Sequence, residues 1–357
     1  MKNLVYKIRR YTWLLLLMFL PVLPASANES EGKGEVDVKS IVFGHIGDSY
    51  EWHITTWGET HISIPLPVIV MGQDGTWHMF FSSEFHHSPT GEYEGFYVAK
   101  GGQFDGKIVE KNAAGAEVRP LDLSITKTAF AIILNSILLC VIILGVSRWS
   151  KRNPNQAPKG FVGTMEMFIM DINDNVIKAC IGKGYERYSP YLLTVFFFIF
   201  FNNLMGLIPI FPGGANVTGN IAITLTLACC TLLAVNLFAT KEYWKEIFWP
   251  DVPLALKPIM IPIEIVGILT KPFALMIRLF ANIMAGHSVI LSLVCLVFIT
   301  ATMGQVLNGS MTVLSVFFGI FMNILELLVA YIQAYVFTML SSVFIGLSLV
   351  EHHHEAK

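Results

Sequence analysis

The run KPFALMIRLFANIMAGH, from Lys271 to His287, places Arg278 in the middle of a segment that is otherwise too apolar to face water. An arginine keeps its charge at every accessible pH, and at mid-membrane depth it costs about 2.5 to 3.5 kcal/mol on insertion scales. A lone arginine of this kind would either snorkel to the lipid headgroups or close a structural ion pair. Such a residue requires either a counter-charge or a function that uses its charge.

Arg278 is not alone on its helix. Glu264 and Lys271 precede it at intervals of seven residues, and on a helix this spacing drifts by only about 20° per step. Asn282 extends the resulting stripe by one turn. A polar stripe on an apolar helix faces protein or a water-filled cavity. The pattern therefore favours a functional role for Arg278.

The composition is that of a membrane protein. Of 357 residues, 54% are hydrophobic and 14% are charged, against about 25% charged in soluble domains. The net charge of -2 and the lack of a basic tract argue against nucleic-acid binding. None of the five cysteines lies between Asn28 and Pro120, so disulfides do not hold that segment together.

The N-terminus has the pattern of a secretory signal peptide. Basic residues precede a short apolar run from Trp13 to Leu20, and Ala25-Ser26-Ala27 follows. This run is too short to span a membrane with such flanks, so we expect residues 1–27 to be removed after Ala27. The mature N-terminus would then lie outside the cytoplasm.

Residues 28–120 are polar and rich in glycine, and we expect them to form a small β-rich exported domain. Alternating pieces at His61–Ile64 and Trp77–Phe81 predict short strands, with turns at Gly72–Gly75 and around Pro89–Gly91. Irregular spacing favours exposed loop histidines over a metal site, which remains the alternative for His45, His53, His61, His78, His86 and His87.

Residues 121–357 predict an all-α polytopic membrane domain. Five membrane helices are expected, at about 128–146, 191–210, 220–239, 258–302 and 311–350. The last two are too long for upright crossings, so they should be steeply inclined and joined by a turn at Met303–Ser310. Residues 161–181 are too charged to span, so they predict an amphipathic helix at the cytoplasmic interface.

Positive charge sets the orientation. Arg148, Lys151, Arg152 and Lys159 follow the first membrane helix and mark the cytoplasmic side. Five crossings from an outside N-terminus place the C-terminus in the cytoplasm.

The last two helices carry a polar set that suits proton transfer. Between Pro258 and Val350 the acidic and basic side chains are Glu264, Lys271, Arg278, His287 and Glu326. Gln333 lies seven residues after Glu326 on the same helix face, and Asn323 nearly one turn before it. A histidine and a carboxylate can pass protons near neutral pH, whereas a permanently charged arginine acts as a barrier or counter-ion.

These residues resemble a known family. The runs LTKPFALMIRLFANIMAGH (269–287) and ELLVAYIQAYVFTMLSSVFIGLSLVEHH (326–353) closely resemble subunit a of the rotary (F-type) ATP synthase membrane sector. NNLMGLIP (202–209) and Asn216-Val217-Thr218 look like that family's first hairpin. The resemblance begins at about Thr128 and leaves the exported domain uncovered.

The resemblance implies a stator in a bacterial inner membrane, whose partners are the lipid bilayer, a ring of c subunits, the b subunits and the rest of the complex. Arg278 would face the carboxylate of each passing c subunit. The residues implied in the outer half-channel are Asn282, His287, Glu326 and Gln333, with Glu264 at the cytoplasmic exit and Lys271 and Asn323 as auxiliary polar groups. His287 and Glu326 stand in the reverse order to many bacterial relatives.

The same resemblance implies an ion-conducting subunit without a hydrolytic site, metal or cofactor, and H⁺ or Na⁺ as the transported ion. The rival class is a proton-coupled secondary transporter, which should show inverted repeats that we do not find in the sequence. An intramembrane metalloprotease would need paired histidines, and His287 stands alone in the membrane region.

Overall fold

The computed structural model describes residues 47–57, 60–88, 91–99, 101–112, 115–208, 211, 213–250, 252–253 and 256–349. Side chains are not described at 53–57, 60–62 and 86–87. The predicted signal peptide and the extreme C-terminus lie outside the described residues, so the cleavage site stays a prediction.

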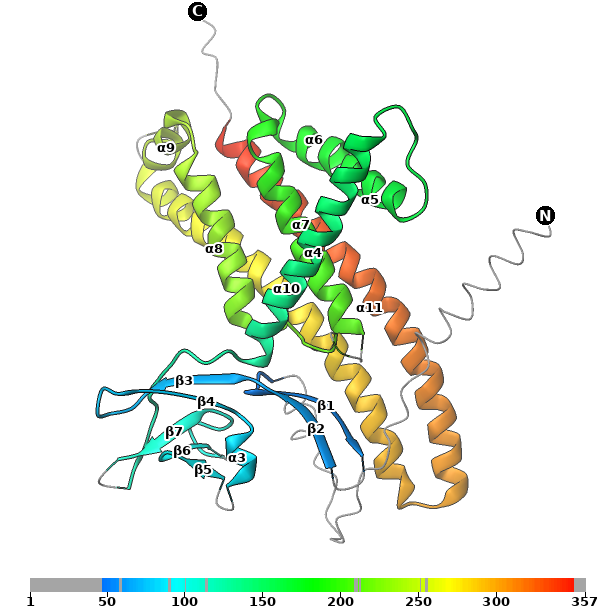
Figure 1. Cartoon of the computed structure of the whole chain (residues 1–357). Coiled ribbons are helices and arrows are strands. Elements are labelled where there is room, and N and C mark those ends of the chain that lie inside the picture. Colours follow the sequence, from blue (N-terminus) through cyan, green and yellow to red (C-terminus); the bar gives the residue numbers. More distant parts are fainter. Residues whose placement is uncertain are drawn as a thin grey trace, which may run out of the picture.

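The helical part is a bundle whose members run up and down between two ends (Figure 1). Its long members are α4 (Lys127–Arg152), α7 (Ser189–Leu207), α8 (Ile221–Leu237), α10 (Lys257–Ala301) and α11 (Gln305–Ser348). Within the described residues, four helices are long and apolar enough to cross a membrane, and up to five if α8 and the short α9 (Lys241–Phe248), bent by 100°, count as one span. The predicted all-α polytopic architecture is confirmed.

Helices α10 and α11 form the long antiparallel hairpin that the sequence predicts. They contain 45 and 44 residues, and at 1.5 Å per residue each is roughly 65 Å long, twice the thickness of a hydrocarbon core. The connection is shorter than the predicted Met303–Ser310. It consists of Thr302, Met303 and Gly304, the last at φ +116°, and Asn308 already lies inside α11, where its side chain accepts a hydrogen bond from Thr300 at 3.2 Å.

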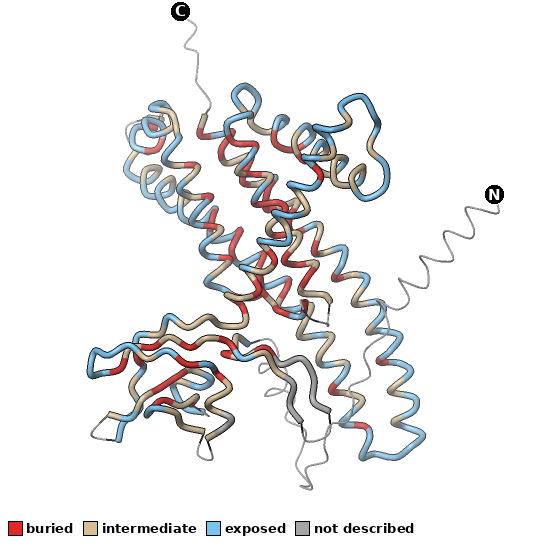
Figure 2. The backbone as a smooth tube through the Cα atoms, viewed as in Figure 1, coloured by how far each residue is buried: buried red, intermediate tan, exposed pale blue. Residues whose placement is uncertain are grey.

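The predicted interfacial segment is a helix at 161–181 with a π-helical middle. It consists of α5 (Phe161–Met170), the π-helix η1 (Asp171–Ile177) and α6 (Lys178–Ile181), and the 3-10 turn η2 (Tyr185–Arg187) leads from it to α7. Its inner face contributes Ile172, Val176 and Ile177 to the main core, with side chains of α7, α10 and α11. Figure 2 shows the buried positions gathered along the inner faces of these helices.

The N-terminal part contains three small antiparallel sheets. The first is the hairpin β1 (Glu51–Trp57) and β2 (Thr60–Pro65), and the second has the order β4 (Trp77–Phe81), β3 (Pro67–Met71), β9 (Leu121–Asp122). The third has the strand order β5 (Glu92–Tyr93), β6 (Phe96–Val98), β7 (Ile108–Lys111), β8 (Glu117–Val118). A single helical turn, α3 (Glu84–His87), follows β4.

A small apolar core holds the second and third sheets together. It contains Val68, Val70, Phe80, Phe96 and Ile108, all buried, with Tyr50 beside them. The predicted strands at 61–64 and 77–81 are confirmed, and so is the turn at 72–75, where Gly72 donates its N–H to Thr76 and Gly75 donates to Gly72. The turn predicted at Pro89 and Thr90 lies outside the described residues.

The β part is tied to the start of α4. The Asp48 carboxylate accepts hydrogen bonds from the Thr128 N–H at 3.0 Å and from its hydroxyl at 2.8 Å. A carboxylate at a helix N-terminus satisfies free N–H groups and complements the helix dipole. The Trp52 ring then packs edge-on against Phe130 of α4 and Phe211 of the α7–α8 loop.

Close packing of α11 on α6 predicts that Gly346→Ala destabilises the protein. A Cβ at this position would lie 2.3 Å from the Cys180 carbonyl oxygen, which is backbone and cannot swing aside. Overpacking of this kind costs about 1 to 3 kcal/mol. The thermal unfolding midpoint of the purified protein should fall. Gly309→Ala, on the same helix with open space around it, is the control, and an equal midpoint for both variants would contradict the prediction.

Candidate functional site

A histidine and a glutamate meet at the centre of the α10–α11 hairpin. His287 Nδ1 lies 3.1 Å from Glu326 Oε1, and the Glu326 side chain is only 4% exposed. The distance fits an ion pair, but neither carboxylate oxygen has a hydrogen bond of good geometry within the described part of the chain. A buried acceptor without a partner is costly. Glu326 is therefore a group with free capacity to take up a proton.

Two glycines lie next to this pair, and one of them leaves space for it. A Cβ at Gly286, on the helix of His287, would lie 3.0 Å from Glu326 Oε1, which is too close for an ordinary contact. A Cβ at Gly206 of α7 would lie 3.7 Å from His287 Nε2, which is an ordinary van der Waals distance. The Glu326 carboxyl group thus fills space that a larger residue at 286 would occupy.

The pair lies at a narrow polar pocket between α7, α10, α11 and the α7–α8 loop. The pocket is too narrow in this structure to hold a water molecule. Its polar lining residues are Asn202, Asn203, Asn216, Thr218, His287 and Glu326. Besides the glutamate oxygens, Asn216 Nδ2 is buried there without a partner among the described residues. Unsatisfied polar atoms are unusual in a folded protein, so they mark this pocket as a candidate functional site.

Asparagines connect this pocket to the rest of the bundle. Thr218 donates to Asn203 Oδ1 at 2.6 Å, and Asn203 Nδ2 donates to the Ala330 carbonyl at 3.3 Å. Deeper in the bundle, Asn135 of α4 donates to Asn202 at 3.0 Å. In the sequence, the motifs at 202–209 and 216–218 indicated only the family resemblance. They did not predict that these side chains lie at the pocket. The available signal was asparagine in apolar helices.

Arg278 lies elsewhere, on the outside of the chain. Its side chain is exposed, and it makes no hydrogen bond or ion pair within the residues that the structure describes. Its neighbours on the same face of α10 are Ala274, Ala281 and Asn282, which are also exposed. A cation on this outer face has no counter-charge among the described residues and requires one from outside them.

The stripe predicted from the spacing of seven lies largely on the same outer face. Lys271 and Asn282 are exposed and Glu264 is half-buried. The Lys271 ammonium lies 5.7 Å from the centre of the Phe344 ring. By helix rise, Glu264 lies about 21 Å from Arg278 towards one end of α10 and His287 about 13 Å towards the other. Arg278 therefore separates the acidic residue from the histidine–glutamate pair.

Gln333 lies between the two parts of the site along the helix axis. It is buried, and it lies about 10 Å along α11 from Glu326. Because α11 runs antiparallel to α10, this displacement brings it close to the level of Arg278. Asn323 is half-buried and donates to the Gly319 carbonyl one turn earlier in α11 at 2.8 Å, so its amide is bonded to its own helix and not to the pocket.

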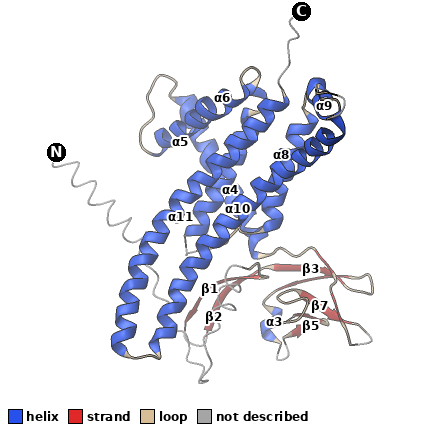
Figure 3. Cartoon of the chain, turned by 180° about the vertical axis from the view of Figure 1, so that it is seen from behind, coloured by secondary structure: helices blue, strands red, loops and turns tan. Residues whose placement is uncertain are grey.

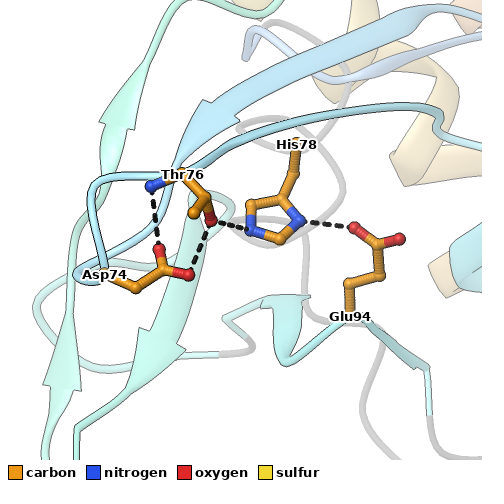
Figure 4. Close-up of polar contacts among 4 residues, drawn as sticks. All are labelled: Asp74, Thr76, His78 and Glu94. Atoms are coloured by element: carbon orange, nitrogen blue, oxygen red, sulfur yellow. Dashed lines mark hydrogen bonds and ion pairs between the residues drawn. The ribbon is translucent and has the colours of Figure 1, made fainter.

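Among the described residues of the β part no group of three potential metal ligands is found, and His78 is the one histidine there whose side chain is described. It links two turns (Figure 4). Its Nε2 lies 2.9 Å from the Thr76 hydroxyl, which donates to Asp74 at 2.6 Å, and its Nδ1 lies 2.6 Å from Glu94. The metal alternative for the other histidines stays a prediction. His45 and the side chains of His53, His61, His86 and His87 lie outside the described part.

The comparisons with known proteins agree with this geometry. A family described as ATP synthase A chain matches residues 132–346, and a domain of unknown function matches residues 41–123. ATP synthase subunit a of Chlorobium phaeobacteroides is 44% identical over 238 residues, which cover 65% of this chain and 67% of that protein. The corresponding protein of Pelodictyon phaeoclathratiforme is 45% identical over 240 residues, covering 66% of this chain and 68% of the relative.

A more distant relative shares the same part of the chain. ATP synthase subunit a of Myxococcus xanthus is 39% identical over 244 residues, which cover 66% of this chain and 76% of the relative. The family match contains α7, α8, α10 and most of α4 and α11, and with them Arg278, the histidine–glutamate pair and the polar pocket. This chain belongs to the ATP synthase A chain family.

Proposed function

We propose that this chain is the stator subunit a of a bacterial F-type ATP synthase, and that Arg278 faces the carboxylates of the rotating c ring. The observation that carries the proposal is an exposed guanidinium on an apolar helix with no counter-charge among the described residues. A c subunit that presents a carboxylate at this depth would supply the missing charge. The b subunits and the remaining subunits complete the assembly.

The polar pocket is the inner end of the half-channel that opens on the side of the β part. His287 and Glu326 would carry the ion there, and Asn203, Asn216 and Thr218 would line the way. Asn282 and Gln333 would lead from the pocket to the ring. Glu264, on the other side of Arg278, would belong to the second half-channel. The transported ion is H⁺ in this scheme, with Na⁺ as the alternative.

A fixed cation between the two half-channels couples ion flow to rotation. A proton that crosses directly would release about 2.3 kcal/mol per 100 mV without doing work. The guanidinium repels a hydronium ion, and it favours the ionised form of a carboxyl group placed against it. Each c-ring carboxyl must therefore lose its proton before it passes Arg278 and gain one after it.

The protein is a multi-pass protein of the bacterial inner membrane, and we assign the β part to the periplasm. Lys151 and Arg152 lie in the last turn of α4, at the end of the bundle opposite the β part, and Arg148 and Lys159 flank that turn in sequence. The positive-inside rule assigns this end to the cytoplasm. Helix α11 ends at Ser348 at the same end of the bundle (Figure 1).

The β part has an accessory, non-catalytic role in this proposal. Trp52 packs in one small core with Ala215 and Val217 of the α7–α8 loop, and Val217 also lines the polar pocket. The domain thus supports the loop at the mouth of the outer half-channel. The sequence supports this role, because residues 28–120 show no nucleophile or phosphate-loop motif.

The first prediction is that Arg278→Ala abolishes ATP-driven acidification of inverted membrane vesicles. Hydrolysis belongs to other subunits, so the complex should still assemble. Arg278→Lys should fail as well, because lysine lacks the planar fork and can lose its proton when desolvated. Arg148→Ala, outside the bundle centre, is the matched control and should pump normally. Wild-type acidification by Arg278→Ala would rule out the barrier role.

The second prediction is that His287 and Glu326 act as a coupled pair. Either single substitution should slow proton translocation, and the double exchange His287→Glu with Glu326→His should retain more activity than either single change. The exchange keeps one acid and one imidazole in contact. Residues in contact show coupling of about 0.5 to 3 kcal/mol. Strictly additive losses in the cycle would argue against a pair.

The third prediction uses the glycine beside the pair. Gly286→Ala should slow proton translocation, because its Cβ would press on Glu326 Oε1 at 3.0 Å and Cδ at 3.2 Å. Gly206→Ala is the matched control, since its nearest contacts are ordinary ones of 3.5 Å and 3.7 Å. Proton flux is compared per assembled complex, measured by subunit content. If the two variants translocate equally fast, the carboxylate does not need this space.

A further inference from the structure

One face of the β4–β3–β9 sheet is exposed and wholly apolar along its strands. Its large side chains are exposed by 55% at Trp77, 74% at Met79, 57% at Phe81, 51% at Leu121 and 60% at Leu123. Between Gly47 and Thr126 these are the only large hydrophobic side chains that the described residues expose. A contiguous apolar patch on a water-soluble surface is rare unless something covers it.

Strand register shows that these side chains share one face. Met79 stands opposite Ile69, and both Trp77 and Leu121 stand opposite Met71. Leu123 continues this row, because its N–H bonds to the Ile69 carbonyl. The alternate positions Val68, Val70 and Phe80 point into the core of the domain. The sheet therefore has a second apolar face besides the one turned to the core, and the described residues leave this second face uncovered.

The uncovered face is on the side of the sheet nearer the membrane helices. Strands β5, β6 and β7 pack on the other face, and in Figures 1 and 3 they lie on the side of β3 that is away from the helices. Strands β3 and β4 extend sideways from the lower end of α4. The open face thus lies beside the bundle, at the level of the N-terminal end of α4.

Short, ordered connections fix this height. Only residues 123–126 separate β9 from α4. Ile125 donates its N–H to Pro67 of β3 at 3.1 Å, and Lys127 donates to Ser49 at 2.8 Å. Since α4 enters the hydrocarbon core from Lys127 onwards, the sheet is held within a few residues of the lipid headgroups.

We propose that this face, formed by Trp77, Met79, Phe81, Leu121 and Leu123, lies on the outer leaflet of the bilayer and inserts these side chains among the lipid headgroups. Tryptophan and phenylalanine beside aliphatic side chains, with no charge between them, match the membrane–water interface. The contact is independent of the ion path. It would hold the domain flat beside the bundle and keep β1 and β2 on the α7–α8 loop.

The test measures the lipid exposure of residue 79 in the full chain. A fluorophore is attached to Met79→Cys after replacement of the five native cysteines, and the assembled complex is reconstituted with lipids that carry a nitroxide near the headgroup. Lys111→Cys is the matched control, because its side chain is 56% exposed on β7, in the sheet on the other side. We expect quenching several-fold stronger at 79 than at 111.

Equal quenching at the two positions overturns the proposal. Protection at 79 from both the nitroxide and aqueous iodide also overturns it, because the face would then be covered by protein. A photo-crosslinking amino acid at 79, with the native cysteines in place, gives a second measurement should the cysteine-free chain fail to fold. Lipid adducts at 79 and none at 111 support the proposal, and adducts to a protein subunit contradict it.

Discussion

The structure depends on one electrostatic constraint, which is that a guanidinium cannot lose its charge in a medium that penalises charge. Arg278 lies on an outer face of α10 and has no counter-charge among the described residues. A protein that worked alone would gain nothing from such an arrangement. The site makes physical sense against a partner that brings negative charge to this depth, and in the proposed function that partner is the ring of c-subunit carboxylates.

The rest of the helical part places ionisable residues on both sides of that cation along α10. Antiparallel α10 and α11 bring His287 and Glu326 together on one side of Arg278, while Glu264 lies on the other. Residues on α7 and the α7–α8 loop complete the pocket next to the pair. Because Glu326 keeps unsatisfied oxygens there, the pocket offers a proton acceptor where the neighbouring surfaces are apolar.

The β part is coupled to this arrangement by contacts that have little to do with its own core. Asp48 satisfies the N-terminus of α4, and Trp52 packs between α4 and the α7–α8 loop. The domain therefore borders the pocket through Val217 without supplying any group to it. Its apolar outer sheet face, lying beside the bundle, gives the domain a second anchor that involves lipid instead of protein.

The sequence by itself determined the class of the protein, its long helices and the polar residues of its ion path. Hydrophobic length and helical spacing are local properties. They therefore predicted the helix at 161–181, the long hairpin and the polar helix face that carries Arg278. Only the tertiary structure decided that His287 meets Glu326, that Asn135 and Asn202 pair, and that the turn between α10 and α11 is as short as Thr302–Gly304. These depend on which helices pack together, and helix packing brings together residues that are distant in the chain, which no local pattern encodes.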